Sequence, residues 1–337
     1  MRVDLRSDTV TQPTIAMKQA MVDAPLGDDV YGEDPTVNRL EAIAAERAGM
    51  ESALFVPSGT MGNQIALRIL TQPGDEVLAH ADSHPLNCEA GGAAVIAGVQ
   101  IRGLAGRHGL LSGPTVRAAI RPADPHIAPV SLLTIEDTTN RGGGAVYPMP
   151  ALTDLTELAN EAGIRIHMDG ARVWNAVVAS GVSLGRRLHG IDTLSFCLSK
   201  GLGCPAGAVL CGPRDLIYTA RRVRKMLGGG MRQSGMLAAA GLHALDHHVE
   251  RLQDDHRRAA TLATGLQGLG LHVETPQTNL VFASGISDPR GLVEFAQEHG
   301  VKFGVVGPDA VRLAVHLDVD DAGVAHAIDV IKRGLEA

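Results

Sequence analysis

The 337-residue sequence lacks the features that membrane, secreted and nucleic-acid-binding proteins need. It has no run of about 18 apolar residues, so we expect no transmembrane helix. The first eight residues are charged and contain no apolar stretch, so we expect no signal peptide. The net charge of -7 provides no broad basic surface to neutralise phosphates. We therefore expect neither membranes nor nucleic acids as partners.

Cysteine is also scarce. The four cysteines, Cys88, Cys197, Cys204 and Cys211, form no C-x-x-C pair and have no evident partner at metal-ligand spacing. We predict reduced cysteines, a cytoplasmic location and no metal site. What the chain does have is 45% hydrophobic and 20% charged residues, the balance of a folded globular protein. Its length exceeds that of one ordinary domain, so we expect two structural units.

Strand-like and helix-like patterns alternate along most of the chain. Strands are predicted near 53–56, 76–79, 93–96, 130–135, 164–168, 194–198 and 208–211, with helices that include 36–49 and 151–162. This alternation predicts a mostly parallel α/β sheet. A long helical region from Ser234 to about Gly268 would lead to a smaller α+β unit. We therefore predict a large domain over 1–245 and a small C-terminal domain over 246–337.

Lys200 stands at the end of one predicted strand. Apolar residues alternate over 194–198, and the glycines and proline of 201–205 prevent a simple continuation of the strand. A lysine at such a corner can enter a pocket and, as a free amine, form a Schiff base with a carbonyl compound. The alternative is a solvated lysine in a turn, and this segment alone leaves both interpretations open.

A second strand end has the features of a small anion site. The strand near 53–56 runs into Pro57-Ser58-Gly59-Thr60, after which an apolar helix follows. Free backbone N–H groups, the helix dipole and two hydroxyl groups at this turn suit a phosphate. The alternative is that Ser58 or Thr60 simply caps the helix.

The strand ends together point to one cofactor. In a parallel sheet, ligands sit beyond the carboxyl ends of the strands, where Ser58–Thr60, His84, Glu136, Asp169 and Lys200 would gather. A carboxylate that keeps a pyridine nitrogen protonated, a lysine that holds an aldehyde and a helix end that holds a phosphate are what pyridoxal phosphate (PLP) chemistry requires. We therefore predict PLP as the cofactor.

Several longer segments resemble those of one family, the low-specificity L-threonine aldolases. The segments are Asp4–Thr11, Gly27–Asp34, Val56–Met61, His167–Arg172, Leu198–Gly203 and Lys225–Gln233, and the resemblance ends at Arg312–Asp318. It implies PLP fold type I, with a mostly parallel seven-stranded sheet and a smaller C-terminal α+β domain. It also implies a lyase that cleaves L-threonine, L-allo-threonine or larger β-hydroxy-α-amino acids to glycine and an aldehyde. Another PLP enzyme of this fold, such as a β-eliminating lyase or an aminotransferase, and a catalytically silent PLP-binding protein are the alternatives.

The resemblance also implies roles for individual residues around the cofactor. Lys200 would form the Schiff base with PLP, Asp169 would pair with the ring nitrogen, and His84 would stack on the ring. Arg172 would lie by the ring oxygen. The phosphate would be held by Gly59 and Thr60, with Arg232 and Lys225 contributed by a neighbouring subunit.

Substrate contacts and assembly follow from the same resemblance. Ser7 and Arg312 would hold the substrate carboxylate, with Arg172 nearby and Tyr31 at the edge of the pocket. His84 and His126 are the candidate bases for the β-hydroxyl proton. The protein would be a homo-oligomer, a tetramer built as a dimer of dimers with active sites shared between subunits.

The chain departs from the usual pattern of this family at three places. These are Pro85–Cys88 after His84, Val130–Leu132 where Thr-Arg-Leu is typical, and Asp137–Thr139 where Asn-Thr-His is typical. Because these segments lie near the pocket in the family, we predict an altered preference for the substrate side chain.

Overall fold

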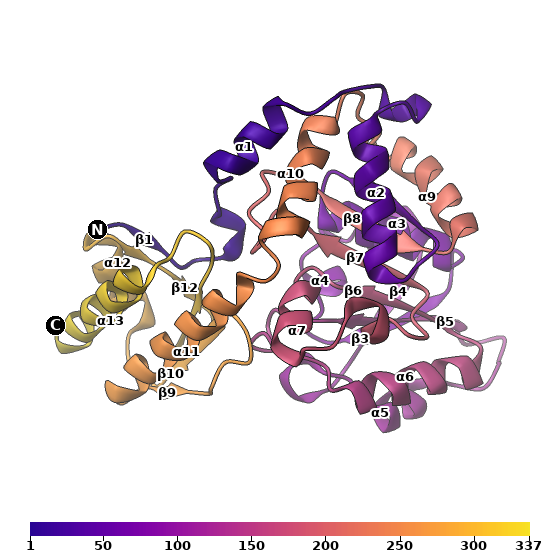
Figure 1. Ribbon diagram of the computed structural model, residues 1–337. Coiled ribbons are helices and arrows are strands. Elements are labelled where there is room, and N and C mark those ends of the chain that lie inside the picture. The colour runs from indigo at the N-terminus through magenta and orange to yellow at the C-terminus, as the bar shows by residue number, and fades with distance from the viewer.

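A seven-stranded sheet forms the centre of the large unit (Figure 1) in this computed structural model, which describes residues 1–337. Its strands are β2 (Ser52–Val56), β3 (Glu76–His80), β4 (Gln100–Leu104), β5 (Val130–Glu136), β6 (Arg165–Asp169), β7 (Thr193–Cys197) and β8 (Ala208–Gly212). Their spatial order is β2-β8-β7-β6-β5-β3-β4, and β8 runs antiparallel to both of its neighbours while the other pairs are parallel. The prediction of a mostly parallel seven-stranded sheet is confirmed.

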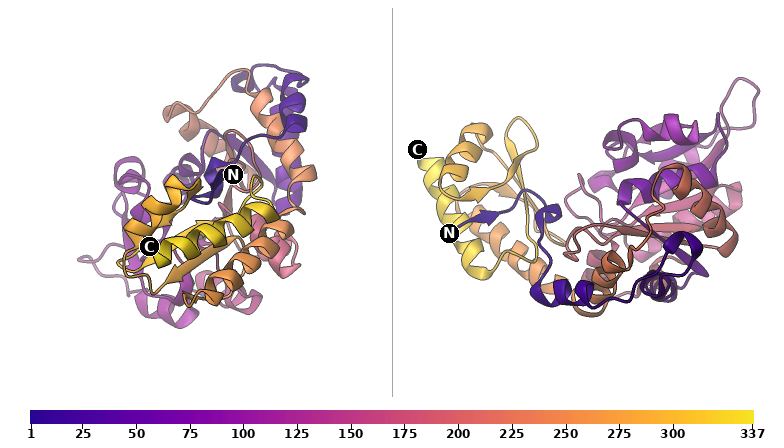
Figure 2. Two further views of the ribbon diagram at one scale, coloured as in Figure 1. Left: turned by 90° about the vertical axis from the view of Figure 1, so that its left-hand side faces the viewer. Right: turned by 90° about the horizontal axis from the view of Figure 1, so that it is seen from above.

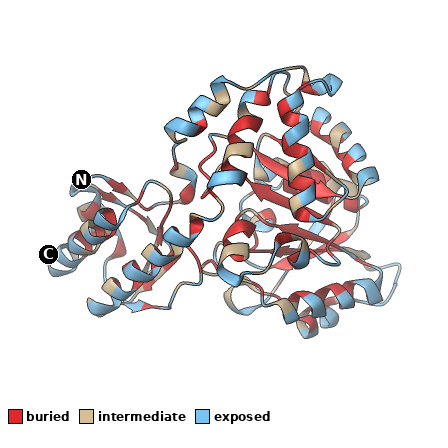
Figure 3. Cartoon of the chain, viewed as in Figure 1, coloured by how far each residue is buried: buried red, intermediate tan, exposed pale blue.

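Both faces of this sheet are covered by helices, which explains why its strands are apolar throughout. In β2, Ala53 and Phe55 belong to the core on one face, while Leu54 and Val56 belong to the core on the other. Figure 3 shows buried strands between helices whose outer faces are exposed. The helices of this unit are α1 (Ile15–Val22), α2 (Pro35–Ala48), α3 (Gly59–Leu70), α4 (His84–Asn87), α5 (Gly113–Ala119), α6 (Met149–Ala162), α7 (Val173–Ser180), α8 (Leu184–Arg187), α9 (Arg214–Met226) and α10 (Gly235–His247).

The smaller unit has a core of its own, built on a four-stranded antiparallel sheet of order β12-β13-β10-β9. Its elements are α11 (Leu252–Gly268), β9 (His272–Val273), β10 (Leu280–Ser284), α12 (Pro289–Glu298), β11 (Val301–Lys302), β12 (Gly304–Val305), β13 (Ala310–Ala314) and α13 (Asp321–Glu336). Strand β1 (Val3–Asp4) pairs in parallel with β11, and Val3 and Leu5 lie in this core. The domain division at residue 245 stays a prediction.

The N-terminal segment connects the two units. Figure 2 shows it leaving β1 at the small unit and running toward α1, which packs along α10 of the large unit. In the part of the segment that precedes α1, the backbone N–H of Gln12 donates to the Asp318 carboxylate of the small unit at 2.9 Å. The short 3-10 turn Asp8–Val10 in this segment lies next to the Lys200 loop, so the connecting segment contributes to the region around Lys200.

One predicted strand is wrong. Residues Ala93–Ala97 form a π-helical segment in which Ala93 and Ala97 are buried and Val95 is 85% exposed. The strand of this region is the edge strand β4, whose alternating polar residues weaken its apolar pattern. The helical region from Ser234 to Gly268 is present as two helices, α10 and α11. None of the helices is both long and apolar enough to cross a membrane.

Candidate active site

The carboxyl ends of five strands meet at one edge of the large sheet. Strands β2 and β7 are both antiparallel to β8, so they run in the same direction as each other and as β6, β5 and β3. A cavity of about 320 Å³ lies beyond this edge. Of the residues predicted for the site, it is lined by Gly59, Thr60, His84, Asp169 and Lys200. The structure thus brings these five residues together.

One end of the cavity is formed by the N-terminus of α3. Ser58 is the N-cap and its hydroxyl oxygen accepts a hydrogen bond from the backbone N–H of Met61 at 3.2 Å. A Cβ atom at Gly59 would lie 2.5 Å from the buried Sγ of Cys197, so glycine is required for this close approach. The backbone N–H groups of this turn and the Thr60 hydroxyl suit a phosphate.

Asp169, the last residue of β6, is buried in a polar network. Its Oδ2 accepts from the Asn63 amide at 2.8 Å and its Oδ1 accepts from the backbone N–H of Ala171 at 3.1 Å. Asn63 Oδ1 lies 3.1 Å from Nε2 of His167. Burial lowers the pKa of His167 to about 4, so this ring is neutral near pH 7 and can donate to Asn63. Asn63 is thereby oriented with its amide N–H groups toward Asp169.

His84 enters the cavity from the first position of α4. Its Nδ1 lies 2.8 Å from Oε1 of Glu89, and this hydrogen bond raises the pKa of His84. The backbone N–H of His84 donates to Oε2 of Glu136 at 3.1 Å. Burial and the neighbouring charge of Asp169 raise the pKa of Glu136 to about 7. His84 therefore lies close to three carboxyl groups, of which Asp169 lines the cavity while Glu89 and Glu136 lie outside its lining.

Atoms of His84, Glu89 and Asp169 lie within 4.8 Å of one another, a spacing that can hold a metal ion and that the sequence did not indicate. The Asn63 amide donates to Glu89 and to Asp169, at 2.8 Å in each case. These donor–acceptor contacts give the group a second explanation, a hydrogen-bonded network that needs no cation.

Arg172 follows Ala171, which lines the cavity, and pairs with a residue that the sequence did not single out. Its guanidinium group donates to both carboxylate oxygens of Asp8, at 2.8 and 2.7 Å, and both residues are buried. Asn140 Oδ1 accepts from Arg172 at 3.4 Å and from Arg312 at 3.0 Å. The two arginines predicted to serve the ring and the substrate carboxylate are thus joined through one amide.

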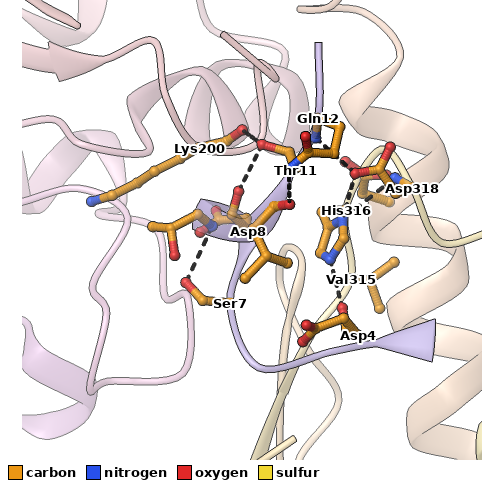
Figure 4. Close-up of polar contacts among 12 residues, drawn as sticks. Asp4, Ser7, Asp8, Thr11, Gln12, Lys200, Val315, His316 and Asp318 are labelled. Atoms are coloured by element: carbon orange, nitrogen blue, oxygen red, sulfur yellow. Dashed lines mark hydrogen bonds and ion pairs between the residues drawn. The ribbon is translucent and has the colours of Figure 1, made fainter. Parts of the chain in front are cut away.

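The N-terminal turn is attached to the Lys200 loop. The Thr11 hydroxyl oxygen lies 2.9 Å from the carbonyl oxygen of Lys200 and 3.0 Å from that of Asp8. Figure 4 shows the Lys200 side chain extending away from these contacts, with its amino group on the far side. Ser7 is the N-cap of the turn, where its Oγ accepts from the backbone N–H of Thr9 at 3.2 Å.

Seven of the predicted site residues do not line the cavity in this chain: Arg172, Arg312 and Ser7, described above, and Tyr31, Arg232, Lys225 and His126. Tyr31 is 75% exposed, and the Arg232 guanidinium lies 5.9 Å from its ring centre and donates to Asp28 at 2.9 Å. Lys225 lies near the end of α9, beside Gly230. The side chain of His126 is 89% exposed and its Nδ1 is 2.9 Å from Asp124.

Sequence reasoning missed three residues of this network. Asn63 follows Gly59 by one helical turn, so the helix periodicity of α3 could have placed it beneath the phosphate end. Asp8 lies inside a segment that carries the family resemblance, although nothing in that segment indicates a partner 164 residues away. Glu89 lies in an irregular turn, where no periodicity indicates its direction.

The donor set fits PLP. The cavity offers an amine at Lys200, a buried carboxylate at Asp169 and, at Gly59–Thr60, a helix N-terminus of the kind that suits a phosphate. These groups come from three strand ends of one sheet edge, so their relative placement is set by the fold.

Comparison with known proteins agrees with this site. Residues 4–285 match the family described as Beta-eliminating lyase. A low specificity L-threonine aldolase of Escherichia coli O157:H7 is 46% identical over 319 residues, which cover 94% of each chain. The structure of a Leishmania major threonine aldolase is 20% identical, with a TM-score of 0.87 and 99% of both chains covered. A structure of SPT solved with PLP is 16% identical, with a TM-score of 0.76, 99% of this chain and 87% of that chain covered.

The two structural similarities establish the fold, which is PLP fold type I as predicted. The sequence similarity is far stronger and extends over nearly the whole chain. On this basis the chain belongs to the low-specificity L-threonine aldolase family.

Proposed function

We propose that the protein is a PLP-dependent lyase that cleaves L-threonine or L-allo-threonine, and larger β-hydroxy-α-amino acids, to glycine and an aldehyde. The observation that carries this proposal is the cavity in which Lys200, Asp169 and the Gly59–Thr60 turn converge. PLP, when bound, withdraws electrons from the α-carbon of an amino acid, which allows a bond at that carbon to break. An aminotransferase or a β-eliminating lyase is less favoured, because the two Escherichia coli relatives that match 94% of the chain are named as aldolases.

Each residue of the cavity would bind a different part of PLP. Lys200 would hold it covalently as a Schiff base, and Asp169 would keep its ring nitrogen protonated. The Gly59–Thr60 turn would bind its phosphate, and His84 would lie on its ring face. The proposal is supported by the four groups lining one cavity. Arg172 would hold the N-terminal turn against the site through Asp8.

Substrate binding is assigned to the edge where the two units meet. Arg312 would orient the substrate carboxylate, supported by Asn140, which accepts from both Arg312 and Arg172. Ser7, in the turn beside this edge, would add a hydroxyl contact. His84 would accept the proton of the substrate β-hydroxyl, since it is the predicted base that lines the cavity of this chain.

The activity is testable with the cofactor-loaded protein and each threonine diastereomer separately. We expect acetaldehyde and glycine in equal amounts, because cleavage of the Cα–Cβ bond yields one of each. Release of ammonia with a keto acid would contradict the proposal and indicate elimination. The ratio of kcat/KM for threonine and a bulkier β-hydroxy amino acid, compared with that of the E. coli relative, would test the altered side-chain preference.

We also propose a homotetramer with shared active sites. Tyr31, Arg232 and Lys225 lie outside their own cavity and would complete the cavity of a neighbouring copy. Ile15 and Val22 on α1 are apolar and are 87% and 72% exposed, which supports a subunit contact at this helix. Light scattering should give a mass near four times 35.2 kDa. A fully active monomer would contradict this arrangement.

A cytoplasmic location is proposed as well. It is supported by the four cysteines, all of which are free.

A further inference from the structure

The carboxylate of Glu89 is enclosed behind His84. Its side chain has no exposed surface. Oε1 lies 2.8 Å from Nδ1 of His84 and 2.8 Å from the Asn63 amide nitrogen, and Oε2 accepts from the Gln64 amide at 2.5 Å. In the ion pairs of the structure, His84 is its only cationic partner. A buried charge needs charged or hydrogen-bonding partners. The Glu89 carboxylate has two neutral amide donors and, as its one ionisable partner, the His84 ring.

The hydrogen-bond chemistry determines where the proton lies on the His84 ring. An ionised carboxylate only accepts, so the Nδ1 atom that faces it must carry hydrogen. In the neutral ring, Nε2 then bears the lone pair. His84 lines the cavity with Lys200 and has 28% of its side chain exposed. Acid–histidine pairs of this kind orient the base in hydrolases that have unrelated folds.

We propose that Glu89 is a positioning residue that holds His84 as the Nδ1–H tautomer and keeps Nε2 as its proton-accepting atom. This inference rests on the proposed function only for the identity of the proton that Nε2 receives. Glu89 acts through His84 and does not line the cavity itself. Asn63 and Gln64 hold the carboxylate in place, so the position of Glu89 does not depend on His84 alone.

Three charged groups act on the His84 ring, and a fourth ionisable group contacts its backbone. Glu89 and Asp169 raise its pKa, and Lys200 lowers it, while Glu136 accepts from its backbone N–H. Removing the charge of Glu89 leaves the opposing effects of Asp169 and Lys200 on the ring in place. The pKa of His84 should therefore fall, and the acid limb of the rate profile, where the base becomes protonated, should move to lower pH.

Two variants separate the charge of Glu89 from its acceptor atoms. Glu89→Gln keeps the shape of the side chain and one oxygen acceptor. The new amide N–H can donate to Oε1 of Gln64, which is buried without a partner. Glu89→Leu removes both acceptors. Glu76→Gln is the matched control, because Glu76 is equally buried but pairs with Arg102 and Arg121 at the opposite end of β3.

We expect Glu89→Leu to lower kcat by about 10- to 100-fold with less than a threefold change in KM, and Glu89→Gln to lower it by about 3- to 10-fold. The second readout does not use activity. In the full-length chain freed of cofactor, the rate of His84 modification by diethylpyrocarbonate, followed by peptide mass spectrometry, should rise with pH around a midpoint that is lower in both variants than in the wild type or in Glu76→Gln.

An unchanged midpoint in both Glu89 variants would overturn the proposal, as would unchanged kcat accompanied only by a lower Tm. If the wild-type protein released no aldehyde from any substrate, the proposed function would fail. The modification midpoint would still decide whether Glu89 controls His84, so the two failures can be told apart.

Discussion

Replacing Lys200 with alanine is expected to lower the rate of threonine cleavage by about 10³- to 10⁵-fold, the scale of losses when a covalent catalytic group is removed. Lys200 is the lysine that lines the cavity between Asp169 and the α3 N-terminus. Without its amine, PLP can be held only through its phosphate, its ring nitrogen and its ring face. Acetaldehyde release measures the rate, and the visible absorption of the bound cofactor shows the change in its attachment.

The control for this variant is Lys332→Ala, which changes an exposed lysine of α13 far along the chain from the cavity. It should leave both the rate and the spectrum unchanged. If Lys200→Ala retained more than about a tenth of the wild-type rate, another group would have to be the one that holds the cofactor, and the assignment of the cavity would be wrong.

Replacing Asp8 with alanine is expected to destabilise the protein by about 3–5 kcal/mol, because it leaves the buried Arg172 guanidinium without its charged partner. Burial acts to raise the pKa of Asp8, but Arg172 holds it at about 2. Since this pKa is below that of an unfolded aspartate, the contribution is complete above about pH 4 and is lost as the pH falls toward 2. Urea unfolding of the cofactor-loaded protein at pH 7 and at lower pH measures both effects.

The exposed pair Arg6–Asp4 provides the comparison, since its side chains are 52% and 29% exposed. Asp4→Asn should change stability by less than about 1 kcal/mol. Equal effects at Asp4 and Asp8 would mean that the bidentate contact to Arg172 contributes nothing specific. Activity should fall with Asp8→Ala as well, because Arg172 and the Lys200 loop both contact the N-terminal turn.

The strand ends could be predicted because each is a local pattern. An apolar run followed by glycine, serine or lysine marks the end of a strand without any knowledge of its neighbours. The parallel arrangement then brings Gly59, Asp169 and Lys200 to one edge. The strand predicted near 93–96 is wrong because the same alanine, valine and isoleucine residues can pack as a helical turn on α3.

The hydrogen-bond network of the site could not be predicted in this way. Asp8 and Arg172 are 164 residues apart, and Asn63 and Asp169 are 106 apart. Short polar side chains such as these meet only after the sheet has formed, and their partners depend on directions that residue type does not encode. His126 shows the reverse case, because its type suggested a base while its exposed loop places it away from the cavity of its own chain.

The pairing of β1 with β11 has a consequence for how the chain is made. Val3 leaves the ribosome about 300 residues ahead of its partner Val301. At about 5–20 residues per second, that interval is about 15–60 s. During this time Val3 and Leu5 have no core to enter, while the strands of the large sheet already have their neighbours. The small unit is therefore completed from both ends of the chain at once, after nearly all of the protein has been synthesised.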